Sequence, residues 1–552
     1  MRRIILFLAA SCALLAVSCR SQHAFHYGWS RIATDGSRTG VVMASAERVA
    51  QAMGTLSDGV YTAPSGRTFR GGATPVVAAV VLAAQDSMAT LKQVIGRSEH
   101  GMVKSRPESA LSDWAVDVLM AETARLTGRR VDFGVLNFGG IRVDMPAGDI
   151  LRDDIESMFP FRNRICYLEL YGRDIRALLE QMAAGKMQVV GGVRVSVRDG
   201  KLRGVTIGGK PLVDGKKYGV CTIDFLLNGG DGLFVAKNAV RLDILDPYIK
   251  EVMLPYVQRQ TAEGRAVDYQ TDGRVLLSAP EGSPAVSHRD TVADWPVSRE
   301  GRRRLTILHA NDTHSHIEPL RGTDQDGMGG VIERAAVIDS VRAADGAKNV
   351  LLVHAGDFSQ GSSYFTQLHG NIEVDLINAM GYDVVTLGNH EFDNGLEDLA
   401  RRVREIRCPV VCCNYDFSPF ELGRYVKPCT VIRKGGLKIG VIGVLTDIRS
   451  VVDRNTADRI PKLDDAAEVQ RWTDWLRNKE KCDLVMLLTH IGYDADPALI
   501  ASVRGVDLVV GGHSHTFLKT MKSVPDADGK PVALVQDGCW GLYLGQIDVF
   551  RK

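Results

Sequence analysis

The sequence predicts an α/β protein with two domains, and three features of the chain lead to this expectation. Short apolar runs alternate with helix-like stretches, a rhythm typical of layered α/β domains. The stretch from Ser278 to Arg304 is rich in Pro, Ser and charged residues and lacks a sustained apolar period, which indicates a linker. With 552 residues, the chain is also long enough to bury at least two cores.

Composition excludes a general attraction to nucleic acid. The chain is 45% hydrophobic and 24% charged, and its formal net charge is only +1. Such a balance creates no field that would draw in polyanions. Any anionic substrate must therefore be bound by local groups, and no nucleic-acid polymer is expected as a partner.

The first residues predict an export signal rather than part of the fold. A basic start, Met1-Arg2-Arg3, precedes an apolar stretch that is too short to span a bilayer comfortably and ends in small residues before Cys19. The sequence "LLAVSC" resembles a bacterial lipobox, in which Cys19 becomes the lipid-modified first residue. We therefore expect a signal segment over residues 1–19 and a periplasmic or cell-surface lipoprotein anchored to a membrane. A plain cleaved signal is the alternative.

Eight cysteines follow the leader, and their spacing forms no paired CxxC zinc pattern. Most lie among Val, Ile and Leu, which favours small buried hydrophobic residues. One or two disulfides in the second half of the chain remain open.

The linker divides the chain into a first domain over residues 25–277 and a second over 305–552. In the second, five consecutive apolar runs end in Asp, Asn or His, a pattern typical of the carboxyl ends of strands in open α/β sheets, where ligands bind. A single His at a strand end is more often a structural residue, but five such ends together indicate a site. The side chains are Asp312 and His314, Asp357, Asn389 and His390, His490, and His513 and His515.

These groups are too many for one metal ion and fit two ions if a carboxylate bridges them. Asp357 is the natural bridge, because it is the only ligand candidate on its strand. The mixture of nitrogen and oxygen ligands suits Zn, Mn, Co or Fe more than Ca or Mg. A two-metal site of this kind predicts phosphoester hydrolysis.

The motifs "NDTHSH", "GDFSQGSSY", "GNHEFDNG", "THIGYD" and "GGHSHT" resemble the five metal motifs of the calcineurin-like metallophosphoesterases, in their 5'-nucleotidase branch. The resemblance implies a four-layer β-sandwich flanked by helices, preceded here by a separate α/β nucleotide-binding domain. It implies that one metal is held by Asp312, His314, Asp357 and His515, and the other by Asp357, Asn389, His490 and His513. Some relatives carry Asn or Gln at the position of His515.

His390 resembles the catalytic His of this family, which contacts the phosphoryl group, and Asp393 resembles its orienting partner. A turn cap is the alternative for Asp393. In "GMGGVIERAAVI", the two glycines predict a tight turn, and Arg334 is expected either at the surface or at the edge of the substrate site.

The first domain carries the candidates for substrate recognition. In "NFGGIRVDMPAG", a Gly pair lets a ligand approach the backbone, and Arg142 offers a planar fork for phosphate. "FPFRNR" and "DFLLNGGDG" each place a Phe at a turn where a base can stack, although core packing is the alternative. Together these segments resemble the 5'-nucleotidase substrate-binding domain. That implies Phe161 and Phe225 as a clamp on the base, Asp231 for the ribose, Asn137 for the base edge, and Arg142 and Arg106 for phosphate.

The order of the domains departs from the family, in which the phosphoesterase comes first. The linker is long enough to reach tens of ångströms, so the open question is whether one chain completes the site or a partner completes it in trans.

We therefore expect an exported hydrolase with two divalent metal ions, which removes phosphate from nucleotides by attack of a metal-bound hydroxide. One alternative is a 2',3'-cyclic-nucleotide 2'-phosphodiesterase with 3'-nucleotidase activity. An alternative of another class is a surface lipoprotein that binds nucleotides without turnover, but it predicts a missing ligand or a lost His390, and neither is missing.

Overall fold

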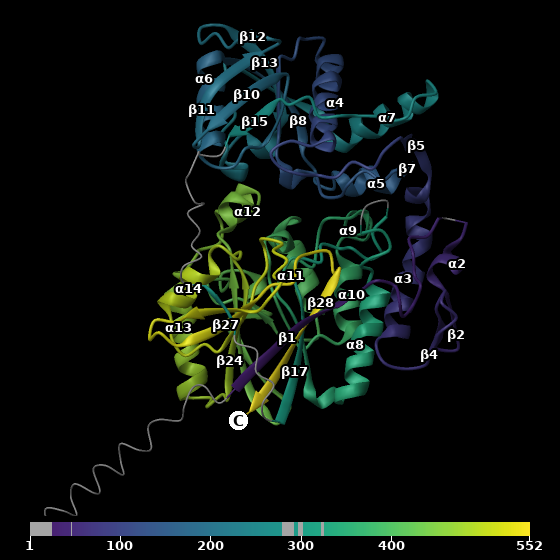
Figure 1. Ribbon diagram of the computed structural model, residues 1–552, viewed down its shortest axis with the longest axis vertical. Coiled ribbons are helices and arrows are strands. Elements are labelled where there is room, and N and C mark those ends of the chain that lie inside the picture. Colours follow the sequence, from purple (N-terminus) through teal and green to yellow (C-terminus); the bar gives the residue numbers. More distant parts are fainter. Residues whose placement is uncertain (1–24, 46, 279–291, 296–301, 322–324, 552) are drawn as a thin grey trace, which may run out of the picture.

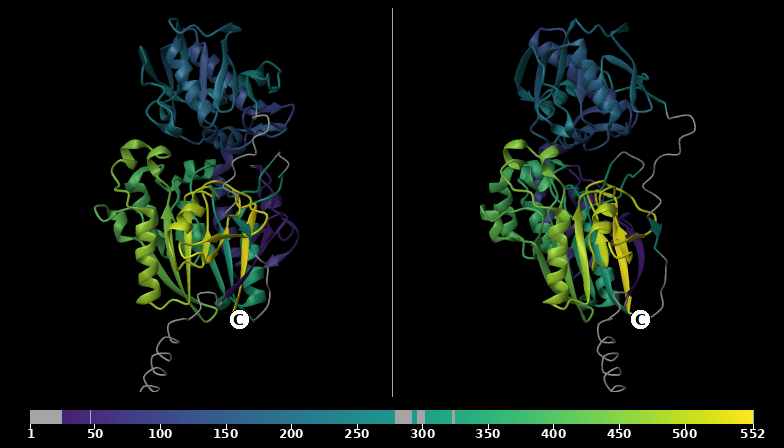
Figure 2. Two further views of the ribbon diagram at one scale, coloured as in Figure 1. Left: turned by 60° about the vertical axis from the view of Figure 1, so that its left-hand side comes forward. Right: turned by 90° about the vertical axis from the view of Figure 1, so that its left-hand side faces the viewer.

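The computed structural model describes residues 25–45, 47–278, 292–295, 302–321 and 325–551. The expected export signal with Cys19, and most of the expected linker, lie outside these residues. The described chain forms two units stacked along the long axis of the molecule (Figures 1 and 2).

The lower unit in Figure 1 is built around two seven-stranded sheets. In spatial order, the strands of the first sheet are β1 (Phe25–Ala33), β28 (Tyr543–Arg551), β17 (Arg302–Ala310), β18 (Val350–His354), β19 (Val384–Thr386), β20 (Val410–Val411) and β21 (Val426–Lys427). Those of the second sheet are β16 (Ala293–Asp294), β26 (Lys522–Pro525), β27 (Pro531–Val535), β25 (Leu508–Val510), β24 (Leu484–His490), β23 (Leu437–Leu445) and β22 (Cys429–Lys434).

The two sheets face each other and carry helices on their outer faces, which gives four layers. Alternation along β18 shows how the sequence builds them: Leu351 and Val353 enter the core between the sheets, whereas Val350 and Leu352 pack under the helices. The first sheet is covered by α3 (Thr74–Met88), α8 (Val331–Asp345), α10 (Asn371–Met380) and α11 (Gly395–Glu405). The second is covered by α13 (Asp465–Asn478) and α14 (Asp496–Ser502). This confirms the expected four-layer sandwich.

The upper unit has its own core and is also a mixture of helices and sheets. Its five-stranded sheet comprises β14 (Arg241–Tyr248), β8 (Arg164–Tyr171), β13 (Lys217–Ile223), β6 (Phe133–Leu136) and β9 (Val189–Gly191). A four-stranded sheet comprises β12 (Lys210–Pro211), β11 (Lys201–Ile207), β10 (Val193–Arg198) and β15 (Val275–Ser278), and a two-stranded one β5 (Val94–Ser98) and β7 (Gly148–Leu151). The helices are α4 (Ala110–Thr127), α5 (Arg152–Met158), α6 (Gly172–Ala184) and α7 (Ile249–Ala262).

The structure differs from the expected domain boundaries at residues 25–92, which pack with the sandwich. β1 pairs antiparallel with β28 over nine residues, from Phe25 opposite Arg551 to Ala33 opposite Tyr543. The apolar stretch Thr74–Lys92 is long and apolar enough to cross a membrane by length and composition only, but its buried face contacts α8 and α10. The remaining short elements before it are α2 (Val49–Met53), β2 (Thr55–Ser57), β3 (Val60–Thr62) and β4 (Thr68–Phe69).

The upper unit is therefore inserted between β1 and β17, two strands of one sheet. Chain crossings at either end join it to the sandwich: one follows Lys92, and the other lies in the expected linker. The far end of that linker belongs to the sandwich, because β16 pairs with β26 and the ring of Trp295 lies 5.5 Å from that of Tyr27.

The parallel strands of the sandwich direct their carboxyl ends at the upper unit. β17 and β18 run parallel to each other and antiparallel to β28, whose end marks the foot of the molecule in Figure 1. Two short helices lie between this edge and the upper unit in Figure 1, α9 (Ser363–Leu368) and α12 (Arg454–Ala457). The 3₁₀ turn η7 (His390–Phe392) also faces the upper unit, since the His390 ring lies 5.7 Å from that of Phe161.

Buried polar contacts hold the two units together at this seam. The Ser363 N–H donates to Ser157 Oγ at 2.9 Å, and the Ser363 hydroxyl donates to Asp153. Arg321 of the sandwich forms an ion pair with Asp154. The relative placement of the units thus rests on matched polar groups as well as on the two chain crossings.

Candidate active site

The side chains expected to bind metal lie together where the sandwich strands end, facing the upper unit. At this place, three groups place one donor atom from each member within 4.8 Å of the others. They are Asp312, His314 and His515; His314, Asp357 and His390; and Asp357, His490 and His513.

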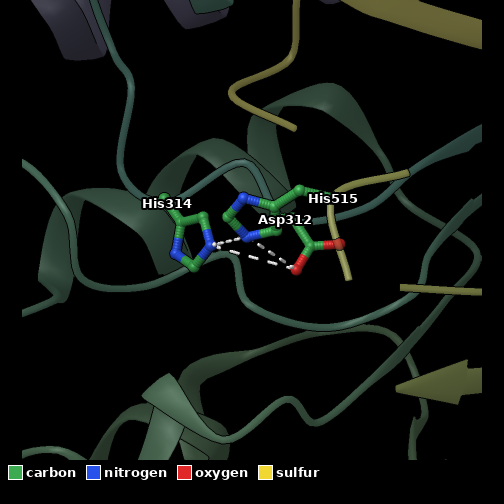
Figure 3. Close-up of side chains that lie close together, drawn as sticks. All are labelled: Asp312, His314 and His515. Carbon is green, nitrogen blue, oxygen red and sulfur yellow. Dashed lines mark hydrogen bonds and ion pairs between the residues drawn. The ribbon is translucent and has the colours of Figure 1, made fainter. Parts of the chain in front are cut away.

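The first group brings two imidazoles against one carboxylate (Figure 3). His314 Nε2 lies 2.9 Å from His515 Nε2 and 3.9 Å from Asp312 Oδ1, and His515 Nε2 lies 3.5 Å from the same oxygen. Two ring nitrogens and a carboxylate oxygen that converge in this way form a donor set suited to a transition metal.

Asp357 connects His314 of the first group with the third group. Its Oδ2 lies 3.7 Å from His314 Nε2 and 3.1 Å from His490 Nε2. In the third group, His513 Nδ1 lies 2.9 Å from Asn389 Oδ1. One carboxylate is thus shared by donors that come from both sheets.

Backbone carbonyls fix the orientation of the two central imidazoles. His314 Nδ1 lies 3.0 Å from the Gln360 carbonyl oxygen, and His490 Nδ1 lies 2.8 Å from that of Ala355. Because a carbonyl only accepts, each Nδ1 carries the proton and each Nε2 is left for a ligand. His490 Nε2 is buried without a hydrogen-bond partner, as a group awaiting a cation would be. The residues present therefore fit a divalent metal.

The loops that carry these ligands adopt a backbone conformation that non-glycine residues rarely occupy. The φ angles are 49° for Asp312, 47° for His314, 53° for Asp357, 76° for His513 and 54° for His515. Hydrogen bonds hold them there: the His513 N–H donates to Asp312 Oδ2 at 2.9 Å, and the His314 N–H donates to the Asp357 carbonyl at 2.9 Å. Strained positions that the surrounding structure enforces are typical of functional sites.

Electrostatics at the site favour a cation. Burial alone would lower the pKa of His490, but the carboxylates of Asp357 and Asp312 outweigh it and raise the pKa to about 10. Burial would raise the pKa of Asp357, but His490 and His390 hold it well below its usual range. Without a metal, protonated histidine balances the carboxylates, and a divalent ion can take over that positive charge.

His390 stands beside the ligands with Asp393 behind it. Its Nδ1 lies 2.8 Å from Asp393 Oδ2, and its ring centroid lies 5.2 Å from that of His314. Burial lowers the pKa of His390, whereas Asp393 and Asp357 raise it, and the net change is upward. The contact supplies the orienting geometry expected for Asp393.

Sequence reasoning assigned no site role to Glu391, which organises the loops beneath the ligands. Its buried carboxylate accepts hydrogen bonds from the N–H groups of Asp357 at 2.9 Å, Ser359 at 3.0 Å and Gly388 at 2.5 Å. Burial and the charge of Asp357 raise the pKa of Glu391 to about 7. The one sequence feature that could have indicated a role for Glu391 is its position inside the motif "GNHEFDNG", which follows an apolar run.

The sequence also gives no indication that Arg402 supports the site. Its buried guanidinium on α11 donates to the Glu391 carbonyl at 2.6 Å and to Ser359 Oγ at 2.9 Å. In the sequence it stands in the charged run "ARRVRE", where nothing distinguishes a buried Arg from an exposed one.

The upper unit supplies the opposite wall of the site. The Phe161 ring centroid lies 5.7 Å from that of His390, and the Arg142 guanidinium carbon lies 5.9 Å from the Phe161 ring. Arg142 is buried, and its Nη2 has no hydrogen-bond partner. Burial lowers the pKa of Arg142, and Asp357 and Asp393 partly offset that effect, which places its charge close to the metal ligands.

The remaining substrate candidates cluster farther along this wall. Asn137 Nδ2 donates to Asp231 Oδ2 at 2.7 Å, and Asp231 has a φ of 48°. Phe225 is half-buried beneath Gly230, and among the described residues it makes no ring contact with Phe161. Arg106 lies 4.3 Å above the Phe138 ring and donates to the Met187 carbonyl, so it does not join the metal ligands.

The structure also answers the expectations for Arg334 and for the cysteines. Arg334 on α8 is buried, at 3% exposure, and does not lie at the surface; its guanidinium packs against the backbone at Gly541. The eight cysteines after the leader are free thiols, mostly buried, so the disulfides left open in the second half are not formed.

Comparisons with known proteins identify both units. The family described as calcineurin-like phosphoesterase matches residues 305–517, and the family described as 5'-nucleotidase, C-terminal domain, matches residues 89–238. The domain described as C-terminal in the 5'-nucleotidases therefore precedes the phosphoesterase domain in this chain.

Named relatives agree with this assignment. The 5'-nucleotidase of Diplobatis ommata is 35% identical over 299 residues, 50% of this chain and 50% of that protein. The snake venom 5'-nucleotidase of Naja atra is 34% identical over 271 residues, 45% of this chain and 50% of that protein, and the human 5'-nucleotidase is 33% identical over 281 residues, 46% and 47%.

Among solved structures, a 5'-nucleotidase precursor from Thermus thermophilus is 35% identical and covers 43% of this chain and 49% of that one, with a TM-score of 0.40. The chain spans about half the length of the curated relatives it matches. The chain thus carries a calcineurin-like phosphoesterase domain preceded by a domain of the 5'-nucleotidase C-terminal type, and over about half of its length it is similar to 5'-nucleotidases.

Proposed function

We propose that this protein is a metal-dependent 5'-nucleotidase, which hydrolyses the phosphate monoester of nucleotides at the cleft between its two units. The observation that carries the proposal is the juxtaposition of Phe161 with His390, 5.7 Å apart between ring centroids. It puts a surface suited to a base or ribose next to the metal ligands. The names of the relatives support the same activity.

Two divalent ions, of the Zn, Mn, Co or Fe type, would be held by the two donor groups. Asp312, His314, Asp357 and His515 would hold one, and Asp357, Asn389, His490 and His513 the other. When bound, such ions neutralise phosphate charge and activate water. The shared position of Asp357 between His314 and His490 supports its role as the bridge.

The chain's own residues would complete the chemistry. His390, oriented by Asp393, would donate to a phosphoryl oxygen as negative charge develops there. Arg142, with an unpartnered Nη2, would receive another oxygen of the same group.

Substrate selection would rest on the upper wall. Phe161 and Phe225 would hold the base from two sides, and Asp231 would accept hydrogen bonds from the ribose, with Asn137 fixing its carboxylate. Arg106 would contribute only at long range to a phosphate or to the rim of the pocket, since its donors already serve the Met187 carbonyl and the Phe138 ring.

We further propose that one chain completes its own site despite the reversed domain order. Phe161 lies beside His390 of the same chain and Arg142 lies beside Phe161, and the polar seam at Ser363 and Arg321 supports this placement. The substrate domain would then extend from about residue 93 to 278, and the phosphoesterase unit would comprise residues 25–92 and the chain from about 292 to 551.

The decisive experiment is phosphate release by the purified chain lacking residues 1–19, supplied with Mn, Co or Zn. AMP, 3'-AMP, 2',3'-cyclic AMP and ribose 5-phosphate are compared, with His390→Ala as the inactive control. Rapid turnover of AMP that the variant loses is expected. Turnover of the cyclic and 3' substrates alone would favour the phosphodiesterase alternative, and nucleotide binding without any turnover in the metal-loaded protein would favour the binding lipoprotein.

Export and lipid attachment at Cys19 belong to the same proposal and need a separate test. Cell fractionation and labelling with a fatty acid should place the wild-type chain in the membrane fraction, and Cys19→Ala should abolish the label. Labelling that survives the substitution would contradict the anchor.

A further inference from the structure

A second cavity lies behind the metal ligands, inside the sandwich. It is narrow, with about 30 Å³ of room for the centres of water-sized spheres, and every residue that lines it is buried. Its walls come from α8, α10, the end of β18 and the loop that carries Asp312 and His314. We call it the rear chamber.

The rear chamber gathers polar atoms that make no hydrogen bond of good geometry, although the Tyr382 hydroxyl lies within reach of the Arg334 guanidinium. Six buried side-chain atoms without a hydrogen-bond partner belong to five of its lining residues. They are Nε and Nη2 of Arg334, Nε2 of His316, Nδ1 of His354, Oε2 of Glu373 and the hydroxyl of Tyr382. Buried polar atoms almost always form hydrogen bonds, with protein or with ordered water. Six buried polar atoms without a partner, in a chamber without water, would therefore strongly destabilise the fold.

Both donors and acceptors face the chamber. Arg334 supplies only N–H donors. Glu373 Oε1 receives the Ser315 hydroxyl, and its Oε2 accepts when the carboxyl is ionised and donates when it is protonated, the form that burial favours by raising the pKa of Glu373. His316 Nδ1 lies 3.0 Å from the His314 carbonyl and must donate to it, which leaves Nε2 as an acceptor. Water donates and accepts, and it therefore fits this mixture better than an anion or a cation.

Arg334 is held in place rather than free to pair elsewhere. A side chain at Gly541, whose φ is 65°, would place its Cβ 1.9 Å from Arg334 Nη2, so the guanidinium lies directly against the backbone there. Arg334 and Glu373 line the same chamber, and among the described residues Arg334 Nε and Nη2 and Glu373 Oε2 make no hydrogen bond to each other. A bridge between them has to come from a third group.

The metal loop forms one wall of the chamber. Asp312 and His314 face the metal site, whereas the neighbouring residues Thr313, Ser315 and His316 line the chamber. Thr313 Oγ1 lies 3.1 Å from His354 Nε2, and the Ser315 hydroxyl donates to Glu373. The strained backbone of the loop is thus supported from behind by residues whose remaining polar atoms face the chamber.

We propose that the rear chamber holds one or two ordered waters, bound among Arg334, Glu373, Tyr382, His316 and His354, and that this water positions the metal loop. The room suffices for one or two molecules, since a water needs about 10–15 Å³ of such space. The proposal concerns metal binding and not nucleotide turnover, so it stands or falls separately from the proposed substrate.

A crystal structure of the whole protein at high resolution, with a second crystal soaked in bromide, tests the contents. Water peaks within hydrogen-bond distance of Arg334 and Glu373, with no bromide signal in the chamber, are expected. An anomalous bromide peak would show an anion site and overturn the assignment. Direct contact between Arg334 and Glu373 across a collapsed chamber would overturn it as well.

The positioning role is tested by Tyr382→Phe, which removes one hydroxyl and keeps the ring. Because residues that support metal ligands act on affinity, we expect Mn²⁺ binding to weaken by about threefold to tenfold. Tyr61→Phe is the matched control: Tyr61 is fully buried in the same unit, but its hydroxyl donates to the Met53 carbonyl, away from the chamber. Unchanged Mn²⁺ affinity in Tyr382→Phe, or an equal loss in Tyr61→Phe, would overturn the positioning role.

Discussion

The two walls of the candidate site are built in different ways. The metal wall of the sandwich presents ligands from strand ends of both sheets, five of the seven buried, on backbone that is strained and held by hydrogen bonds. The substrate wall of the upper unit presents half-buried side chains from loops and 3₁₀ turns, such as Phe161, Phe225 and Asp231. Chemistry requires fixed geometry, whereas recognition tolerates loops that vary. The comparison predicts that substitutions in the first wall remove activity and those in the second redirect it.

Asp357→Asn should break the metal wall most completely. The change removes the charge shared by His314 and His490, so we expect loss of bound metal and a fall in turnover of at least about a thousandfold. Metal content and phosphate release are measured together. Asp375→Asn, at an exposed position of the same unit, should retain both. Full metal occupancy in Asp357→Asn would contradict the bridging role.

His390→Ala should lower kcat by about a hundredfold to ten-thousandfold while leaving metal content unchanged. Asp393→Asn should have a smaller effect and change the pH profile. Because Asp393 raises the pKa of His390, its loss lowers that pKa. If protonated His390 is the active form, activity declines as pH rises through this pKa, and the decline should start at lower pH in Asp393→Asn. An unshifted profile would mean that Asp393 serves only as a turn cap.

Base recognition should depend on the substrate wall alone. Stacking on an aromatic ring contributes about 1–3 kcal/mol, so Phe161→Leu should raise KM for AMP by about tenfold and leave ribose 5-phosphate hydrolysis nearly unchanged. Phe234→Leu is the control, since Phe234 lies in the same unit with 47% of its surface exposed. Equal losses on both substrates would show that Phe161 acts through His390 and not through a base.

Metal affinity should rise with pH. His490 binds a metal only as the neutral ring, and its pKa of about 10 in the metal-free site means that a proton must leave first. Affinity should therefore increase by up to about tenfold per pH unit between about pH 6 and 8. Calorimetric titration with Mn²⁺ in two buffers of different ionisation enthalpy reports the released proton. The same affinity at both ends of this range would exclude the coupling.

A substitution in the polar seam that joins the two units should have the smallest effect on stability and activity. Arg321 is 26% exposed where it pairs with Asp154, so Arg321→Met should cost less than about 1 kcal/mol in unfolding free energy. Thermal unfolding and KM for AMP are measured on the same samples. A large rise in KM without loss of stability would show that the pair sets the width of the cleft.

Much of the metal wall was predictable because its signals are local. Each ligand follows an apolar run directly in sequence, and the strand-end pattern is visible without a structure, as at Asp357 after "NVLLVHAG". Glu391 and Arg402 escaped prediction because their roles depend on which backbone groups lie nearby in space.

Residues 25–92 were assigned to the wrong unit for a related reason. The partner of β1 is β28, at the other end of the described chain, and no local pattern reports such a pairing. The apolar character of this segment predicted burial correctly, but it did not say against which core.

The pairing of β1 with β28 has a consequence for how the chain is ordered. Phe25 lies opposite Arg551, so the described chain closes on itself within one sheet. A circular permutant that joins these two positions by a short loop and opens the chain between residues 279 and 291 would read sandwich first and substrate domain last. It would keep each strand beside the neighbours it has now. The reversed order is, in this sense, a change in where the polypeptide is cut and not in how it is folded.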